Sequence, residues 1–290
     1  MSDIWKAFAL TIVPEGLEAA AEVLREVGAG GVCLEEGDGW AKAVAHFPLV
    51  DAERIGEKLA GAALDLRRWW PVEISSWEEE EDGWLEAWRR SLHPLRVGRR
   101  LVVLPGDFVF VPAPREVPIR IRPGMAFGTG DHPTTLLCLG WLDELVRGGE
   151  KVLDVGTGSG ILAISALRLG AREAVAVDDD PLAIREAREN ARANGVAGAL
   201  SAILGDFREL DLAGADLAVA NIFLPQVLEL LPLVRKRLSP GGAFIASGVS
   251  VGQGEELLRA FTAAGFRGEL RETDGWVAVA GRLSSAGVGK

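Results

Sequence analysis

The 290-residue sequence predicts an α/β protein in two parts, a small α+β unit followed by a larger, parallel, doubly wound sheet. Three features indicate this architecture. Residues 1–75 follow the order β-α-β-β-α-β. From Lys151 onward, strand-like and helix-like runs alternate regularly. A glycine-rich turn, GTGSG at 156–160, directly follows the first strand of that alternation.

Residues 1–75 are predicted to form four strands and two helices. WKAFALTIVP is rich in β-branched and aromatic residues and predicts a strand, and EGLEAAAEVLREVGAG predicts a helix that Gly28 ends. GGVCLEE and WAKAVAHF predict a hairpin around GDG; DAERIGEKLAGAAL predicts a helix, and RRWWPVEIS a closing strand. This order is the ferredoxin-like split arrangement. The part contains no catalytic pattern, so we expect it to recognise a substrate.

Residues 76–98 are predicted to form a linker with a helix. Five consecutive acids, Glu78 to Asp82, are typical of a solvated helix start, with a negative patch for a lysine-rich partner as the alternative. Trp84 and Trp88 are four residues apart and therefore share one helix face.

Residues 99–283 are predicted to form the second domain. Two strand-like runs, RRLVVLPGD and EVPIRIRPG, precede the alternating region. Its predicted strands are the strand part of KVLDVGTGSG, then EAVAVDDD, ALSAILGD, ADLAVANI and AFIASG, and a final antiparallel pair surrounds TDG. Crossover helices between parallel strands give a doubly wound sheet. Residues 284–290 are expected to be a flexible tail.

Composition excludes several classes of protein. A net charge of −11 argues against a general nucleic-acid binder, which needs a basic face. The N-terminus has no run resembling a signal peptide, and no window resembles a membrane span. Cys33 and Cys138 match no metal spacing and indicate a reducing compartment. We therefore expect a cytoplasmic, monomeric protein that needs no metal.

Polar residues stand at the ends of four successive predicted strands. Asp154 precedes the glycine turn that follows the first strand, Asp178 stands after the second strand, Asp206 after the third and Asn221 after the fourth. Ligands of doubly wound sheets bind at the carboxyl ends of the strands. These four residues therefore predict a ligand site along that edge.

The glycine turn narrows the ligand class. Its glycines follow G-x-G-x-G, and Ile161 occupies the third glycine position of the dinucleotide fingerprint. Asp154 would repel a pyrophosphate but would favour a cationic amino group, and Asp178 is placed to accept hydrogen bonds from ribose hydroxyls. No Lys-Ser or Lys-Thr pair follows the turn, which excludes a nucleoside-triphosphate loop. The pattern predicts a ligand with an adenosine half and a cationic amino-acid half.

Several longer motifs in the sequence resemble those of known protein families. VLDVGTGSG, AVAVDDDP and the terminal antiparallel pair resemble the class I S-adenosylmethionine-dependent methyltransferases. PGMAFGTGDHPTT at 123–135, WLEAWRR and VANI resemble the bacterial ribosomal protein L11 methyltransferases. The resemblance implies a Rossmann-like class I sheet behind a ferredoxin-like recognition domain. It also implies methyl transfer from S-adenosylmethionine to lysine side chains and the N-terminal amine of ribosomal protein L11. The alternative is another protein, such as an electron-transfer flavoprotein subunit.

The resemblance also implies functional roles for individual residues. Asn221 matches the position beside the methyl donor and the incoming amine, so it is expected both to bind the cofactor and to act in catalysis. The other expected cofactor contacts are Thr135, Gly156, Gly158, Asp178 and Phe127, the last beginning a cover that runs to Gly130. Many amine methyltransferases have Asn-Pro-Pro-aromatic at the fourth strand end, whereas this chain has Asn-Ile-Phe.

Some alternatives stay open at this stage. His132 is either a general base or a loop histidine near a helix start, and we favour the second. Thr134 and Thr135 could simply cap backbone N–H groups. Competing functions are a small-molecule methyltransferase, which would not need the first domain, a nicotinamide-dependent oxidoreductase, and a non-catalytic binding module.

Overall fold

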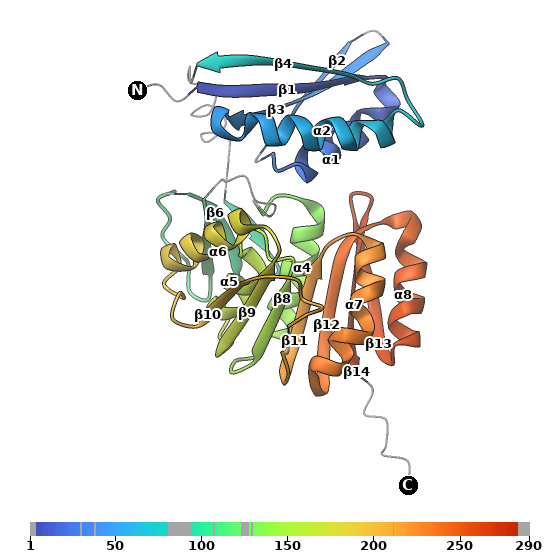
Figure 1. Cartoon of the computed structure of the whole chain (residues 1–290). Helices are drawn as coiled ribbons and strands as arrows, with labels where there is room; N and C mark the ends of the chain where they lie inside the picture. The colour runs from blue at the N-terminus through green and yellow to red at the C-terminus, as the bar shows by residue number, and fades with distance from the viewer. Residues whose placement is uncertain are drawn as a thin grey trace. The chain divides into compact units, whose positions relative to one another are not determined.

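The computed structural model describes residues 4–29, 31–37, 39–80, 94–106, 108–122, 128, 130–210 and 212–283. The chain forms two compact units: β1 to β4 belong to the first and β5 to β14 to the second (Figure 1).

The first unit has the predicted β-α-β-β-α-β order. Its elements are β1 (Ile4–Ile12), η1 (Pro14–Gly16), α1 (Leu17–Glu26), β2 (Cys33–Gly37), β3 (Trp40–Pro48), η2 (Leu49–Asp51), α2 (Ala52–Leu66) and β4 (Glu73–Glu80). The antiparallel sheet has the strand order β2-β3-β1-β4. Phe8, Leu10 and Ile12 alternate along β1 and face a core that includes Leu24 and Leu59 from the two helices. The ferredoxin-like arrangement predicted from the sequence is confirmed.

The predicted start of the linker is wrong. β4 continues to Glu80, because β1 extends far enough to pair with it through Lys6↔Glu78 and Ile4↔Glu80. Lys6 Nζ lies 3.5 Å from Glu78 Oε1, so a cross-strand cation partly compensates the acidic run. Glu78 to Glu80 therefore belong to a strand and do not begin a helix. The predicted linker helix and its tryptophans, within 81–93, lie outside the described residues.

The second unit is built on a seven-stranded sheet. Its elements are β5 (Leu95–Val97), β6 (Leu101–Pro105), β7 (Val117–Ile121), α4 (Pro133–Leu145), β8 (Lys151–Val155), α5 (Ile161–Arg168), β9 (Glu173–Asp178), α6 (Pro181–Ala193), β10 (Leu200–Leu204), β11 (Ala215–Asn221), α7 (Leu224–Arg237), β12 (Leu238–Ser250), η3 (Val251–Gln253), α8 (Gly254–Ala263), β13 (Phe266–Thr273) and β14 (Trp276–Leu283).

The strand order of this sheet is β10-β9-β8-β11-β12-β14-β13. β8 to β12 are parallel, and β14 is antiparallel to both of its neighbours, as predicted. From β8 the chain first builds outward to β10, then returns to place β11 on the other side of β8. This reversal between β8 and β11 is the topological switch point, where doubly wound sheets bind ligands.

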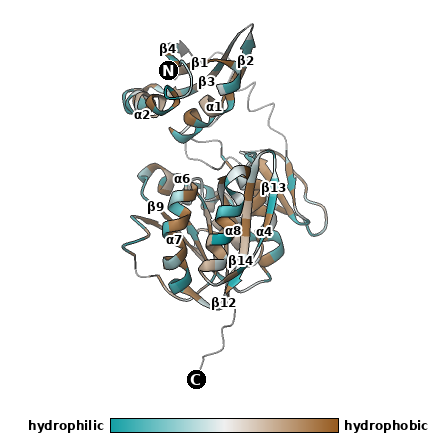
Figure 2. Ribbon diagram, turned by 90° about the vertical axis from the view of Figure 1, so that its right-hand side faces the viewer, coloured by the Kyte–Doolittle hydropathy of each residue, from teal (hydrophilic) through white to brown (hydrophobic). Residues whose placement is uncertain are grey.

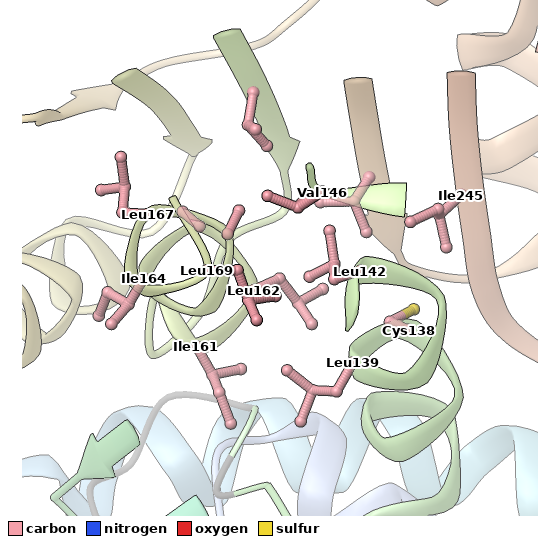
Figure 3. Packing of buried hydrophobic residues seen from close by; sticks show 14 of the residues in the cluster. Cys138, Leu139, Leu142, Val146, Ile161, Leu162, Ile164, Leu167, Leu169 and Ile245 are labelled. Atoms are coloured by element: carbon pink, nitrogen blue, oxygen red, sulfur yellow. The ribbon is translucent and has the colours of Figure 1, made fainter. Parts of the chain in front are cut away.

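Helices cover both faces of the sheet. α4, α5 and α6 pack on one face and α7 and α8 on the other (Figure 1). Helix α7 is coloured in both teal and brown turns, as expected for a helix with one buried side (Figure 2). On the first face, Leu139 and Leu142 of α4 point toward Ile161 and Leu162 of α5, which joins these helices into one core (Figure 3).

The two strand-like runs before α4 form a separate small sheet with the order β5-β6-β7. It packs on α4, α5 and α6 instead of extending the large sheet. Asp143 of α4 anchors it, because its Oδ2 accepts the Arg99 N–H at 2.7 Å and its Oδ1 accepts Arg100 Nε at 2.8 Å. The small sheet thereby positions the chain that leads into α4.

Candidate active site

The glycine turn stands at the switch point and needs left-handed backbone. Gly156, Gly158 and Gly160 have φ values of 71°, 53° and 83°, which L side chains rarely adopt. A Cβ at Gly160 would also lie 3.0 Å from the Cα of Ala187 on α6. The three glycines thus allow a tight connection from β8 to α5 with α6 packed against it.

Asp154 is the penultimate residue of β8, just before this turn, and is fully buried. Its Oδ2 accepts Thr157 Oγ1 at 2.7 Å and the Ala163 N–H at 3.1 Å. The second bond caps α5, whose N-cap residue, Gly160, has no side chain. Burial raises the pKa of Asp154 to about 7, although the two hydrogen bonds favour the charged form. Its Oδ1 has no partner among the residues that the structure describes.

Asp178 faces the turn from the end of β9. The Gly158 N–H donates to its Oδ2 at 2.9 Å, and the Asp180 N–H donates to its Oδ1 at 3.0 Å. Partial burial raises the pKa of this carboxyl, and the same two hydrogen bonds oppose the rise. A carboxylate offers about four lone-pair sites, so both oxygens can still accept the hydroxyls of a ribose.

The threonines of the HPTT motif do not cap the helix. α4 begins at Pro133, and His132 is its N-cap, with Nδ1 accepting the Thr134 N–H at 3.3 Å. The hydroxyls instead face the end of β11: Asn221 Nδ2 donates to Thr134 Oγ1 at 3.1 Å and to Thr135 Oγ1 at 3.4 Å. The cap interpretation of the threonines is therefore wrong, because the preceding histidine takes that role.

These contacts agree with one orientation of the Asn221 amide. In the tautomer in which His132 Nδ1 is the unprotonated ring nitrogen, it accepts the Thr134 N–H. In that tautomer the Thr134 hydroxyl, 2.7 Å from Nδ1, directs its proton to Nδ1 and presents a lone pair to Asn221. Only the amide nitrogen of Asn221 can meet that lone pair. Its Oδ1 is buried and has no partner among the described residues.

The structure does not place Asp206 together with Asp154, Asp178 and Asn221. Asp206 follows the edge strand β10, and its carboxylate is paired with the Arg208 side chain, which lowers its pKa. The predicted contact Phe127 lies outside the described residues, and of the expected cover, 127–130, the structure describes only Gly128 and Gly130.

Sequence reasoning did not identify a role for two buried polar residues, Ser159 within the turn and Asn190 next to it. Asn190 Nδ2 donates to the carbonyl oxygen of Ser159 at 2.9 Å. A signal for it exists in the sequence, because the buried face of α6 otherwise consists of Ala183, Ile184, Ala187 and Ala191. An asparagine on an apolar helix face indicates a specific hydrogen-bond partner.

The arrangement fits a cofactor with an adenosine half and a cationic amino-acid half. Asp178 can accept ribose hydroxyls, the left-handed glycines expose backbone, and two buried oxygens, Asp154 Oδ1 and Asn221 Oδ1, lack partners within the described chain. An orphaned buried acceptor is costly unless a ligand satisfies it.

Within the described parts of the chain, the helices are too short or too polar to span a bilayer. The same residues contain no group of three or more His, Cys, Asp or Glu side chains arranged to hold a metal ion.

Comparisons with known proteins agree with this geometry. The family model described as ribosomal protein L11 methyltransferase matches residues 4–284. A ribosomal protein L11 methyltransferase from Symbiobacterium thermophilum is 50% identical over 204 residues, 70% of this chain and 66% of the relative. One from Pelotomaculum thermopropionicum is 37% identical and aligns over 97% of this chain and 99% of its own.

A solved structure gives the same result. The ribosomal protein L11 methylase from Lactobacillus delbrueckii subsp. bulgaricus has a TM-score of 0.61 and 31% identity, covering 67% of this chain and all of that one. The chain therefore belongs to the ribosomal protein L11 methyltransferase family and is an S-adenosylmethionine-dependent methyltransferase with a Rossmann-like class I sheet.

Proposed function

We propose that this chain transfers methyl groups from S-adenosylmethionine to amino groups of ribosomal protein L11, namely lysine side chains and the N-terminal amine. The observation that carries the proposal is the orientation of Asn221. Its amide nitrogen donates to two threonine hydroxyls, and its Oδ1, which has no partner among the residues that the structure describes, lies at the strand end next to the glycine turn. An incoming amine needs such an acceptor.

The cofactor contacts are part of the proposal. Asp178 would accept the ribose hydroxyls, Gly156 and Gly158 would lie against the methionine half, and Thr135 would contact the cofactor from α4. Phe127 remains a prediction from the family resemblance. When bound, S-adenosylmethionine supplies a methyl group on a positively charged sulfur.

Asn221 would orient the nucleophile. Its Oδ1 accepts an N–H of the substrate amine, which turns the nitrogen lone pair toward the methyl donor, and such orientation contributes several kcal/mol in other systems. A lysine amine has an ordinary pKa of about 10.4 and reacts only when neutral. Desolvation in a buried pocket lowers the pKa of an amine, which favours loss of its proton to water.

The charge distribution supports a basic protein substrate. The first 80 residues contain 16 acidic and 7 basic side chains, a net charge of −9 out of −11 for the whole chain. A ribosomal protein that binds RNA phosphates is typically basic. We propose that the first unit recognises this substrate and the second performs the chemistry. Substrate affinity should then weaken as salt rises, because exposed charges are screened.

The function is tested by incubating the enzyme with methyl-labelled S-adenosylmethionine and purified ribosomal protein L11, followed by mass mapping. Label is expected on lysine side chains and on the N-terminal amine. An electron-transfer flavoprotein is tested in parallel as the alternative substrate. Asn221→Ala is the enzyme control: it loses one of several cofactor contacts, so it should still bind cofactor, more weakly, and should transfer far more slowly at saturating cofactor.

The outcomes separate the parts of the proposal. Label on the flavoprotein but not on L11 would sink the substrate assignment and leave the chemistry intact. Undiminished transfer by Asn221→Ala would remove Asn221 from its catalytic role.

A further inference from the structure

Helix α6 carries two buried asparagines one helical turn apart, Asn190 and Asn194. Within the described part of the chain, Asn194, at the C-cap, bonds only to backbone outside the turn: its Oδ1 accepts the Arg120 N–H at 2.8 Å, and its Nδ2 donates to the Arg120 carbonyl at 2.6 Å and to Asn190 O at 2.8 Å. Asn190 instead links two separate segments. Its Oδ1 accepts the Arg122 N–H at 3.1 Å, and its Nδ2 donates to Ser159 O in the glycine turn at 2.9 Å.

Ser159 makes a second connection from the same place. Its hydroxyl donates to the Gly128 carbonyl at 2.6 Å. Arg122 and Gly128, six positions apart in the sequence, are therefore both tied to Ser159, one through Asn190 and the other directly. Both linking side chains are about 2% exposed, so little water competes for these bonds.

The Ser159 carbonyl, which accepts the hydrogen bond from Asn190, lies outside the helices and strands, so no regular secondary structure orients it. Ser159 stands between two left-handed glycines, Gly158 and Gly160, and belongs to no helix or strand. Asp178 holds the Gly158 N–H on one side, and Asn190 holds the Ser159 carbonyl on the other. Together these two contacts determine how the peptide groups of the turn are oriented.

We propose that Asn190 is a positioning residue for the cofactor: through Ser159, it holds the glycine turn in the shape that receives S-adenosylmethionine. The inference rests on the proposed contact between the turn and the cofactor. It predicts that loss of the Asn190 amide weakens cofactor binding more than it slows methyl transfer at saturating cofactor.

The test compares Asn190→Ala with Asn194→Ala. Both remove a buried amide from α6 that bonds to the chain near β7, so both should lower the melting temperature, but only Asn190 contacts the turn. Titration calorimetry with S-adenosylhomocysteine should show a Kd about tenfold higher for Asn190→Ala and within about twofold of wild type for Asn194→Ala. The KM for S-adenosylmethionine should rise similarly, with kcat within about twofold.

The outcomes are distinguishable. If wild-type protein does not bind S-adenosylhomocysteine, the proposed cofactor site itself fails. If wild type binds but Asn190→Ala has an unchanged Kd, or if Asn194→Ala weakens binding equally, the positioning role is overturned. Should the alanine variant not fold, Asn190→Asp at pH 8 retains size and the acceptor for Arg122 but loses the donor to Ser159. The same increase in Kd is then expected, and an unchanged Kd again overturns the proposal.

Discussion

The buried carboxyl of Asp154 should make both stability and cofactor affinity depend on pH in a way that Asp154→Asn removes. Burial raises its pKa to about 7, whereas an aspartate in the unfolded chain titrates near 3.9. The folded protein therefore holds this proton more tightly than the unfolded chain does. Raising the pH from about 4 to 7 lowers the stability of wild type, and the loss is complete above that interval.

The magnitude follows from the two pKa values. Each pKa unit corresponds to about 1.4 kcal/mol, so ionising Asp154 costs the wild-type fold about 4 kcal/mol at most, of which about 2.5 kcal/mol falls between pH 5 and pH 8. Of the groups around Asp154, the Cys138 thiol does not titrate in that range, because burial and the Asp154 charge raise its pKa above its ordinary value, and Thr157 is not ionisable. Asp178, whose carboxyl disfavours ionisation of Asp154, is present in both proteins, so its own titration contributes to both unfolding curves.

The assay is urea unfolding of wild type and Asp154→Asn at several pH values. The free energy of unfolding of the variant, relative to wild type, should rise by about 2.5 kcal/mol from pH 5 to pH 8. The cofactor provides a second readout, since its ammonium group should favour ionised Asp154. The wild-type Kd for S-adenosylhomocysteine should fall more than tenfold from pH 5.5 to pH 7, where an α-amino group remains largely charged.

Two results would refute the reasoning. A constant difference in unfolding free energy across this range would mean that Asp154 has an ordinary pKa. A Kd that falls equally in the folded Asp154→Asn variant would mean that the pH dependence of binding arises elsewhere.

Three further substitutions have defined outcomes. Asp178→Ala should raise the Kd for S-adenosylhomocysteine about 100-fold, because it loses two charge-assisted hydrogen bonds, and calorimetry with an unchanged Kd would contradict the ribose role. His132→Ala should destabilise the fold by about 1 kcal/mol through loss of the α4 cap and should reduce kcat/KM far less than Asp178→Ala does; complete loss of turnover with normal cofactor affinity would instead make it a general base. Gly160→Ala should destabilise by about 1–3 kcal/mol, measured by urea unfolding, since its φ is 83° and its Cβ would press on α6, and a neutral effect would show that the turn relaxes.

The sequence was sufficient for much of the fold because local patterns and the global architecture agree. Apolar runs that follow helix-ending glycines indicated several of the strands. The final hairpin was predicted from TDG, where Asp274 and Gly275 indeed have positive φ values. The extension of β4 was not predictable from local pattern, since an acidic run disfavours a strand and only the length of β1 provides its partner.

The candidate site was predictable to a similar extent. Asp154, Asp178 and Asn221 were found because the ends of parallel strands share one edge. Which group a side chain faces was not predictable. The threonine hydroxyls turn to Asn221 because a histidine takes the helix cap, and Asn190 reaches the turn only through packing of α6.

The contact between Asn221 and the α4 threonines has a consequence for synthesis of the protein. The partners Thr135 and Asn221 are 86 positions apart. At about 5–20 residues per second, a ribosome needs roughly 4–17 s to add that length of chain. During this interval the residues of α4 have been synthesised but those of β11 have not. The Asn221 contact to the threonines therefore cannot form until β11 has been synthesised and paired with β8, and tight cofactor binding should indicate chains whose central sheet has already formed.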